Sequence, residues 1–396
     1  MTGAQSFRLA FIVESGTDVR LVEGLAARAN LTVVARRVIG GREISQPTAV
    51  PAERVVGPSS FVWFAWFAFR WLLRHGGRYD VVLVQGYGLA ALATNIAAAL
   101  VRVPAIMLVC SPVEAYYACR RIVDGERSYR WIEALGIWVI ARLNAAIARR
   151  YIVLSPYLAT VVRSHGTRAV VDVIPVYGVD ISVFRPDEET RFEVRRRLGL
   201  PTNASLIFFS SRIAPEKDPD TLLAAVNLLR AERRDVRVLH LSGGFRTFLE
   251  RADRRSLRDA VVARDAVPPF THLAEWYRAA DVCVQASREE GLGFSPLEAL
   301  ACGVPVVAAA VGGLRDTIRD GDTGWTYPVG DVRALADALR SVLDHPLEAE
   351  RRAARGRQLV CREYARDLVF DAFVELLTRG RSGVCHAEGA ERAVAG

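Results

Sequence analysis

The stretch "EEGLGFSPLEALACGVPVV", Glu289 to Val307, joins a glycine-rich loop to the start of a helix and then to a run of apolar residues. Ser295 is a good N-cap residue, Pro296 suits the first helical position, and Glu298 lies where a capping box needs a carboxylate. The apolar run that follows the helix predicts a buried strand. Helices that alternate with such strands are typical of a parallel sheet, so the stretch favours an α/β fold.

The same alternation occupies most of the chain. The first half contains the apolar runs "RLAFIV", "LTVVAR", "DVVLVQ", "AIMLV", "YIVLS" and "VDVIPV", and the second half contains "SLIFFSS", "VRVLHLSGG", "VCVQAS" and "VPVVAAA". A charged stretch at 185–201 separates the two sets. We therefore expect two Rossmann-like, doubly wound domains, with ligands bound in a cleft between them at the carboxyl ends of the strands.

The length agrees with this organisation, because 396 residues are about twice the size of a single core. We expect a first domain at 1–185 and a second at 200–360. A C-terminal helix at 361–380 should pack back on the first domain, and residues 381–396 should form a flexible tail.

The charge of the chain is uneven. Residues 1–180 contain 20 basic and 12 acidic residues, and the remaining residues contain 32 of each. The excess positive charge of the first half favours an anionic surface or partner. These basic residues are scattered rather than clustered, which argues against a protein that binds nucleic acid.

The six cysteines form no CxxC pair and fall mostly in apolar segments. This distribution is typical of buried thiols in a reducing cytoplasm and predicts no structural zinc. The N-terminal apolar run predicts a first strand and not a signal peptide. We therefore expect a cytoplasmic protein.

An aromatic segment, "FVWFAWFAFRWLL" at Phe61–Leu73, is too short to span a bilayer. Its aromatic residues would point in every direction around a helix. Two interpretations stay open: a helix buried on all sides, or a helix at a membrane interface. Neighbouring Arg70, Arg74 and Arg78 suit anionic headgroups and also suit simple solubility.

The glycine-rich loop before the second-half helix predicts a ligand site. Gly291 and Gly293 let the backbone approach a ligand closely, and the helix N-terminus attracts an anion. Glu290 and Glu298 would repel a phosphate unless each accepts hydrogen bonds from hydroxyl groups. A sugar nucleotide has a diphosphate and many hydroxyls, so it would satisfy both carboxylates.

A second motif, "SSRIAPEKDPDTLLAA" at Ser210–Ala225, follows the strand "LIFFS". Arg212 and Lys217, which is the single lysine among 52 basic residues, could neutralise a diphosphate without a metal. The alternative for Arg212 is an exposed ion pair with Glu216. The "DPD" at 218–220 has the spacing of a metal motif, but acidic residues are common in the first turn of a helix.

These motifs together resemble the donor region of the retaining glycosyltransferases of family four, which have the GT-B fold. The similarity is carried by "EEGLGFSPLEALACGVPVVAAAVGGLRDTIRDGDTGWTYPVGD", "GVDISVFRP", "SRIAPEKDPDTLLAA" and "YRAADVCVQAS", in the family's order. It is close over about 205–331 and loose in the first half. The resemblance implies that the first domain binds an acceptor and the second a nucleotide-sugar donor.

The resemblance also implies roles for individual residues. Glu290 would serve the donor sugar and Glu298 the ribose hydroxyls, while Arg212 and Lys217 would hold the diphosphate. The implied donor loops further include Gly291, Gly293, Phe294, Ser295, Leu297, Gly243 and Gly244. No metal or other cofactor is expected.

The first half departs from the family pattern in three places. After the first strand, "ESGTD" offers only Gly16 where the family often has paired glycines. Cys110 and Ser111 occupy a position where the family often has histidine, with Glu114 nearby, so Ser111 and Glu114 are candidates for the acceptor side. Tyr177 stands where the family commonly has asparagine.

The expected function is transfer of a sugar from a nucleotide-diphosphate donor to an acceptor hydroxyl, with the retained configuration implied by the resemblance alone. The aromatic segment favours a lipid-linked or cell-surface glycan as acceptor and a peripheral position on the inner face of the membrane. A sugar-nucleotide epimerase of the same fold and a non-catalytic, membrane-associated protein that binds nucleotide sugars are the alternatives. Hydrolysis by paired carboxylates is disfavoured, because it needs the two acids on opposite sides of one bond.

Overall fold

The computed structural model describes residues 7–37, 52–124, 130–187, 189, 191–233, 235–265 and 271–379. Contacts divide the chain into two compact units. The first unit consists of residues 1–114, 127–177 and 368–396, and the second consists of residues 115–126 and 178–367. The expected tail at 381–396 lies outside the described residues.

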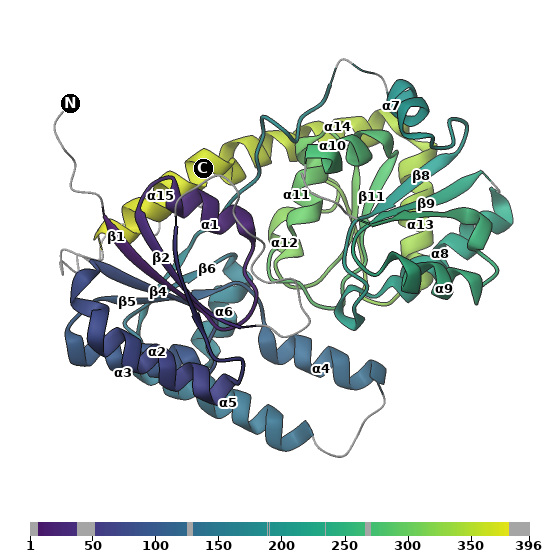
Figure 1. Ribbon diagram of the computed structural model, residues 1–396. Coiled ribbons are helices and arrows are strands. Elements are labelled where there is room, and N and C mark those ends of the chain that lie inside the picture. The colour runs from purple at the N-terminus through teal and green to yellow at the C-terminus, as the bar shows by residue number, and fades with distance from the viewer. Residues whose placement is uncertain are drawn as a thin grey trace, which may run out of the picture. The chain divides into compact units, whose positions relative to one another are not determined.

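The first unit is built on a seven-stranded parallel sheet in the order β3-β2-β1-β4-β5-β6-β7 (Figure 1). Its central strands are apolar on both faces because helices cover both sides of the sheet. The strands are β1 (Arg8–Val13), β2 (Asn30–Arg36), β3 (Glu53–Gly57), β4 (Val81–Gln85), β5 (Ala105–Val109), β6 (Arg150–Val153) and β7 (Val170–Val173).

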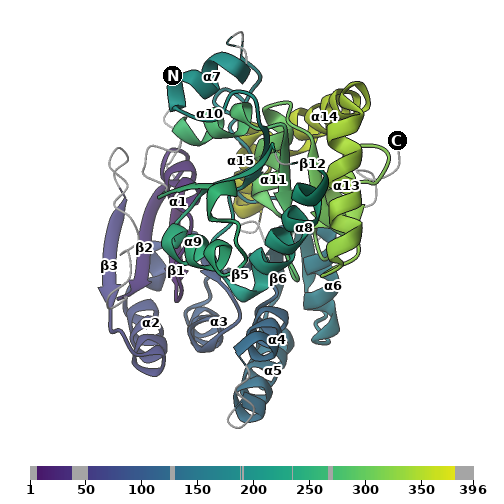
Figure 2. The same cartoon turned by 90° about the vertical axis from the view of Figure 1, so that its right-hand side faces the viewer.

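Helices α1 (Val19–Ala26) and α15 (Arg366–Arg379) lie together on one side of this sheet (Figure 1). On the other side, α2 (Phe61–His75), α3 (Leu89–Val101) and α5 (Arg130–Ile147) lie side by side (Figures 1 and 2). The short η1 (Gly76–Arg78) follows α2, and α6 (Pro156–Ser164) joins β6 to β7. Helix α4 (Val113–Asp124) begins in the first unit, whereas its residues from Ala115 cluster with the second.

The last helix completes the first unit. The ring of Phe370 is fully buried, and a Cβ atom on Gly24 of α1 would lie 1.9 Å from it. The glycine therefore provides the space into which the ring packs. Arg28 adds an ion pair with Asp371 at 3.4 Å. Residues 368–379 cluster with the first unit for this reason.

The second unit has a six-stranded parallel sheet in the order β10-β9-β8-β11-β12-β13. Fully buried side chains from α8, α9 and α13 pack together on it, among them Leu222, Val226, Phe248 and Leu339. The strands are β8 (Ser205–Phe209), β9 (Val236–Leu241), β10 (Val261–Arg264), β11 (Val282–Gln285), β12 (Val306–Ala309) and β13 (Trp325–Tyr327).

The helices of the second unit follow its strands in an α/β alternation. Asp331 caps α13, because its side chain accepts a 3.0 Å hydrogen bond from the amide of Ala334. The helical segments are α7 (Arg191–Leu198), η2 (Pro215–Lys217), α8 (Pro219–Glu232), α9 (Phe245–Asp253), η3 (Arg258–Ala260), α10 (Thr271–Ala279), α11 (Phe294–Ala301), α12 (Leu314–Thr317), α13 (Val332–Asp344), α14 (Pro346–Leu359) and η4 (Val360–Tyr364).

The aromatic helix α2 has two distinct faces. Phe64, Ala68 and Leu72 are fully buried, whereas Trp63 and Trp66 are 64% and 50% exposed. The interpretation of a helix buried on all sides is therefore wrong. Among the described helices, none combines the length and the apolar character that crossing a bilayer requires.

Candidate functional site

The loop after β11 carries a carboxylate that collects three hydrogen bonds on one oxygen. Oε2 of Glu290 lies 2.5 Å from Nζ of Lys217, 2.9 Å from Nε2 of Gln285 and 3.0 Å from Oγ of Ser287. The side chains of Lys217 and Glu290 are only 12% and 10% exposed. Two expected site residues from separate loops thus form one ion pair. Gln285 and Ser287 were missed because their roles depend on this convergence.

The other oxygen of Glu290 has a longer contact. Oη of Tyr116, which clusters with the second unit, lies 3.4 Å from Oε1. Burial raises the pKa of Tyr116 above its ordinary value, so its hydroxyl remains a hydrogen-bond donor near neutral pH. The Lys217 ammonium lies 5.9 Å from the centre of the same ring. The sequence motifs of the second half could not indicate this tyrosine, since it belongs to α4.

Arg212 lies elsewhere in the loop that follows β8. Its guanidinium is 67% exposed, and Nη2 lies 3.6 Å from Oε1 of the fully buried Glu216. The structure therefore contains the ion pair that was the alternative interpretation of this residue. An exposed arginine in such a loop can still turn toward an anion, because its side chain is long and little constrained.

The "DPD" motif has a structural role. Oδ1 and Oδ2 of Asp218 accept hydrogen bonds from the amide and the hydroxyl of Thr221 at 3.3 and 2.7 Å, which caps α8. Asp220 forms ion pairs with Arg251 and Arg255. Both carboxylates are therefore satisfied by the protein itself.

The start of α11 differs from the prediction. The helix begins at Phe294, with Gly293 as the N-cap residue at φ +90°, so Ser295 lies inside the first turn. The predicted capping box between Ser295 and Glu298 is wrong. Instead, Oγ of Ser295 accepts a hydrogen bond from Oγ of Ser210 at 2.9 Å. A glycine replaces the expected serine cap because the chain turns here through a left-handed conformation that glycine adopts without strain.

Glu298 is 4% exposed, and its Oε2 accepts a hydrogen bond of 2.9 Å from the hydroxyl of Tyr277. Burial raises the pKa of Tyr277 well above its ordinary value. The same hydroxyl lies 3.0 Å from Oγ of Ser210, which connects Glu298 to the first turn of α11. Glu298 is thus part of a hydrogen-bond network with Tyr277 and Ser210. The spacing of the sequence motif does not predict these two partners.

A pair of glycines before α12 allows two loops to meet. A Cβ atom on Gly312 would lie 2.1 Å from the carbonyl oxygen of Glu290, and one on Gly313 would lie 2.2 Å from that of Gly291. The amide of Gly313 also donates a 3.0 Å hydrogen bond to the carbonyl of Glu290. The Gly312–Gly313 pair therefore supports the loop that carries Glu290.

The remaining loop residues of the second unit have different environments. Gly243 is exposed, with open space where a Cβ atom would lie, and Gly244 has φ +88° at the start of α9. Gly291 and Leu297 are buried, and Phe294 is half-buried. The loops at Gly244 and Gly293 thus both turn through left-handed glycines where a strand gives way to a helix.

In the first unit, Glu114 forms a cluster with residues that the sequence did not single out. Nε2 of the buried His165 lies 3.0 Å from Oε1 of Glu114, and the Tyr87 hydroxyl lies 3.4 Å from Oε2. Ser111 is half-buried just before α4, and Gly16 is exposed after β1. All these residues follow the carboxyl ends of β1, β4 and β5 or the end of α6. His165 lies in no recognisable sequence motif, so the sequence analysis did not identify it.

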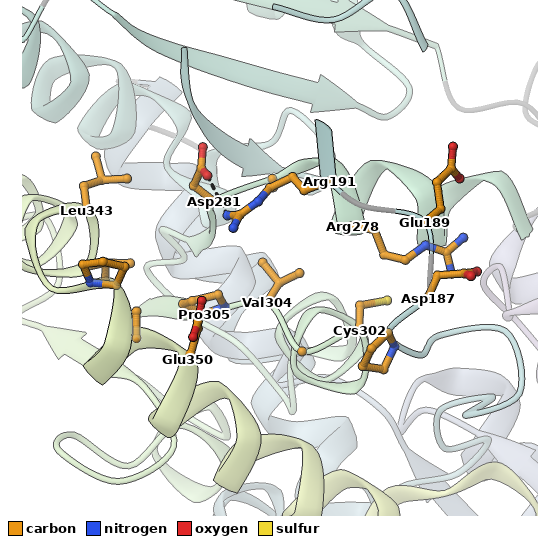
Figure 3. A pocket seen from close by; sticks show the side chains of 16 residues that line it. Asp187, Glu189, Arg191, Arg278, Asp281, Cys302, Val304, Pro305, Leu343 and Glu350 are labelled. Atoms are coloured by element: carbon orange, nitrogen blue, oxygen red, sulfur yellow. Dashed lines mark hydrogen bonds and ion pairs between the residues drawn. The ribbon is translucent and has the colours of Figure 1, made fainter. Parts of the chain in front are cut away.

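A cavity of about 310 Å³ opens in the second unit at the amino ends of β11 and β12 (Figure 3). Its charged groups are largely paired with one another: Arg191 lies 2.6 Å from Asp281, and Arg278 lies 3.5 Å from Asp187. Ligands of α/β sheets bind at the carboxyl ends of strands, where Glu290 lies. This cavity is therefore separate from the candidate site. Within the described ranges, no three His, Cys, Asp or Glu side chains are grouped as metal ligands.

Two Rossmann-like units with parallel sheets define the class of the protein, which is the GT-B fold. HepE (Alr3699) of Anabaena, solved in complex with UDP, matches with a TM-score of 0.75 and 18% identity over 94% of this chain and 100% of that chain. Sucrose-phosphate synthase of Thermosynechococcus elongatus matches with a TM-score of 0.74 and 21% identity over 95% and 100% of the two chains. These likenesses confirm the expected fold.

Within this class, residues 190–359 match the family described as Glycosyl transferases group 1. The D-inositol 3-phosphate glycosyltransferase of Thermomonospora curvata is 40% identical over 220 residues, which cover 52% of this chain and 50% of the relative. D-inositol 3-phosphate glycosyltransferase 2 of Catenulispora acidiphila is 42% identical over 180 residues, 43% and 42% of the two chains. The chain thus spans half or less of the length of these relatives. The resemblance inferred from the motifs is confirmed.

Proposed function

We propose that the protein transfers a sugar from a nucleotide-diphosphate donor to an acceptor hydroxyl, with retention of configuration. The observation that carries the proposal is the ion pair of Lys217 and Glu290 beside the N-terminus of α11, within the segment of the Glycosyl transferases group 1 family. A lysine and a helix N-terminus favour a diphosphate, and a carboxylate favours sugar hydroxyls.

In this proposal, each group has a defined role. The nucleoside diphosphate leaves with the electron pair of the anomeric C–O bond, so negative charge develops beside the Lys217 ammonium and the amides at the start of α11. The exposed Arg212 turns from Glu216 to the diphosphate. Glu290 uses Oε2 to hold Lys217, Gln285 and Ser287, and Oε1 accepts a hydroxyl of the donor sugar. No metal ion takes part.

The acceptor is proposed to be a lipid-linked or cell-surface glycan, and the protein itself is proposed to lie peripherally on the inner face of the membrane. The exposed tryptophans of α2 support this choice. The family model ends at residue 359 and begins at 190, so it supports the donor side of the reaction and not an acceptor. Glu114, with His165 beside it, is the proposed acceptor-side carboxylate of the first unit.

Donor binding tests the proposal directly. Thermal unfolding is measured with UDP, GDP, ADP and their sugar conjugates in the presence of a metal chelator, because a ligand of the folded state raises its stability. We expect one diphosphate to stabilise the wild type and Lys217→Ala to lose that shift. Arg212→Ala should weaken it, whereas Arg333→Ala, an exposed arginine on α13, should leave it unchanged. No shift with any diphosphate would contradict the proposal.

Product analysis then separates the alternatives. Transfer releases the nucleoside diphosphate only when an acceptor is present, whereas an epimerase changes the donor sugar without one. A protein that only binds nucleotide sugars shows the thermal shift but does neither. D-inositol 3-phosphate and extracted membrane glycolipids are the first acceptors to compare.

A further inference from the structure

The outer surface of α2, α3 and α5 is unusually apolar. These three helices lie side by side on one side of the first unit's sheet (Figures 1 and 2). Trp63 of α2 and Leu100 of α3 are each 64% exposed, and Trp138 of α5 is 46% exposed. Single exposed apolar residues are normal on a protein, but a surface shared by three adjacent helices is not.

The exposed residues follow the helical repeat on α5. Ile132, Leu135, Val139 and Leu143 are exposed at spacings of three or four residues, so they form one stripe along the helix. The opposite face of α5 is buried through Ala141, Asn144 and Ala145. The helix is therefore fixed to the unit by small residues while its larger apolar residues face outward. The sequence analysis singled out α2 alone, and α5 extends the apolar surface.

The charges on this surface are mainly positive. Helices α2 and α3 contain no acidic residue, and α5 contains only Glu133. Arg70, Arg74 and Arg142 are exposed on α2 and α5, and none of the ion pairs found in the described part of the chain involves them. The guanidinium groups of Arg70 and Arg142 lie 5.8 and 4.9 Å from the ring centres of Trp66 and Trp138.

We propose that the outer face of α2, α3 and α5 binds the surface of an anionic lipid bilayer. Tryptophan rings lie stably at the level of the headgroups, aliphatic side chains enter the acyl boundary, and arginines bind lipid phosphates. A second copy of the chain fits this face less well, because a two-fold contact would bring the same arginines against one another. The inference deepens the proposed function by naming the surface that meets a membrane-linked acceptor, while its evidence lies in the first unit alone.

Co-sedimentation of the full-length chain with vesicles tests this inference. The wild type should bind vesicles of phosphatidylglycerol and phosphatidylcholine and should bind more weakly at high salt or to phosphatidylcholine alone. The α5 variant Leu135→Gln/Trp138→Gln and the α2 variant Trp63→Gln/Trp66→Gln should each reduce partitioning about tenfold or more. Arg70→Gln/Arg74→Gln should reduce it by about fivefold for each arginine.

A matched control removes two exposed apolar residues from the second unit. Leu347 and Phe192 are 82% and 54% exposed, so Leu347→Gln/Phe192→Gln changes the same kind of surface in another place and should bind like the wild type. Circular dichroism and thermal unfolding confirm that each variant is folded. A folded α5 variant that partitions like the wild type would overturn the inference.

Two further readouts keep the outcomes separate. If the wild type is a dimer by light scattering, binds no vesicles, and becomes monomeric in the α2 and α5 variants, the surface binds a second copy and the bilayer is excluded. The thermal shift with nucleoside diphosphates should be equal in the wild type and both variants. If a variant loses vesicle binding but keeps the thermal shift, only the membrane-binding surface has been affected. If the wild type binds vesicles but shows no thermal shift with any nucleotide, only the proposed sugar transfer is contradicted.

Discussion

The ammonium group of Lys217 lies 2.5 Å from Oε2 of Glu290, although the two residues are 73 positions apart in the chain. Their loops follow β8 and β11, which are neighbours in the sheet of the second unit. Because parallel strands end at the same edge, the pairing of these two strands brings the two loops together. The strand order thus creates the ion pair.

Removing both partners of this pair should cost less stability than the two separate removals added together. Lys217→Met leaves a little-exposed carboxylate without its counter-charge, and we expect a loss of about 3 kcal/mol in the free energy of unfolding. The double variant Lys217→Met/Glu290→Gln should lose clearly less than the sum of the single variants. Urea unfolding of the four proteins provides the measurement. Strictly additive losses would show that the two groups do not interact in solution.

Gly312→Ala should destabilise the second unit by about 2 kcal/mol or more. Its φ of +49° and the carbonyl oxygen of Glu290, 2.1 Å from the new Cβ atom, both oppose a side chain. Gly243→Ala is the matched control, because no atom lies within 4 Å of its new methyl group. Thermal unfolding compares the two variants. Equal stabilities would mean that the two loops do not approach each other as described.

His240 should make stability depend on pH. It is fully buried beside Phe209 and Phe248, and burial lowers its pKa from 6.5 to about 4. The unfolded chain therefore binds a proton more readily between these values, so stability is complete above pH 6.5 and falls as the pH drops toward 4. The expected loss is about 3 kcal/mol.

His240→Gln tests this dependence, since glutamine keeps an amide donor for the carbonyl of Phe209 but does not titrate. Unfolding by urea at several pH values measures both proteins. The free energy of unfolding of the wild type minus that of the variant should change between pH 4 and 6.5 and should be constant above pH 6.5. A constant difference at every pH would contradict the prediction.

Phe370→Ala should destabilise the first unit by about 3 to 5 kcal/mol, because the ring is fully buried and its removal leaves a cavity beside α1. Leu368→Ala on the same helix removes a side chain that is 53% exposed and should change stability by less than about 0.5 kcal/mol. Thermal unfolding monitored by tryptophan fluorescence distinguishes the two. Similar effects of both changes would show that α15 is not packed through Phe370.

The sequence predicted the interior strands of both sheets and the edge strand β7, and it missed β3, β10 and β13. All three lie at sheet edges. An edge strand has one neighbour and is less completely covered, so its apolar pattern is shorter and more polar; β3 reads "ERVVG" and is mostly exposed. Interior strands are covered on both faces, and their continuous apolar runs made them recognisable.

Several residues of the site could be predicted from the sequence, but their hydrogen-bond partners could not. Glu290, Glu298 and Lys217 were found because glycines, helix starts and a single lysine mark their loops. Gln285 and Tyr277 have no such mark, since their importance follows from which strands and helices become neighbours. The cap of α11 was assigned to Ser295 because serine is the commoner cap, whereas the actual turn needs a left-handed residue and uses Gly293.

The contact between Arg28 and Asp371 links residues 343 positions apart within one unit. During synthesis on a ribosome, α1 emerges early, but the helix that covers Gly24 emerges only after nearly the whole second unit has been made. Until α15 is synthesised, the apolar surface of α1 around Gly24 is not covered by Phe370. The first unit therefore either stays unfolded or folds without α15 and binds this helix later. Translation speed and chaperones that shield apolar surface would then influence the yield of folded protein.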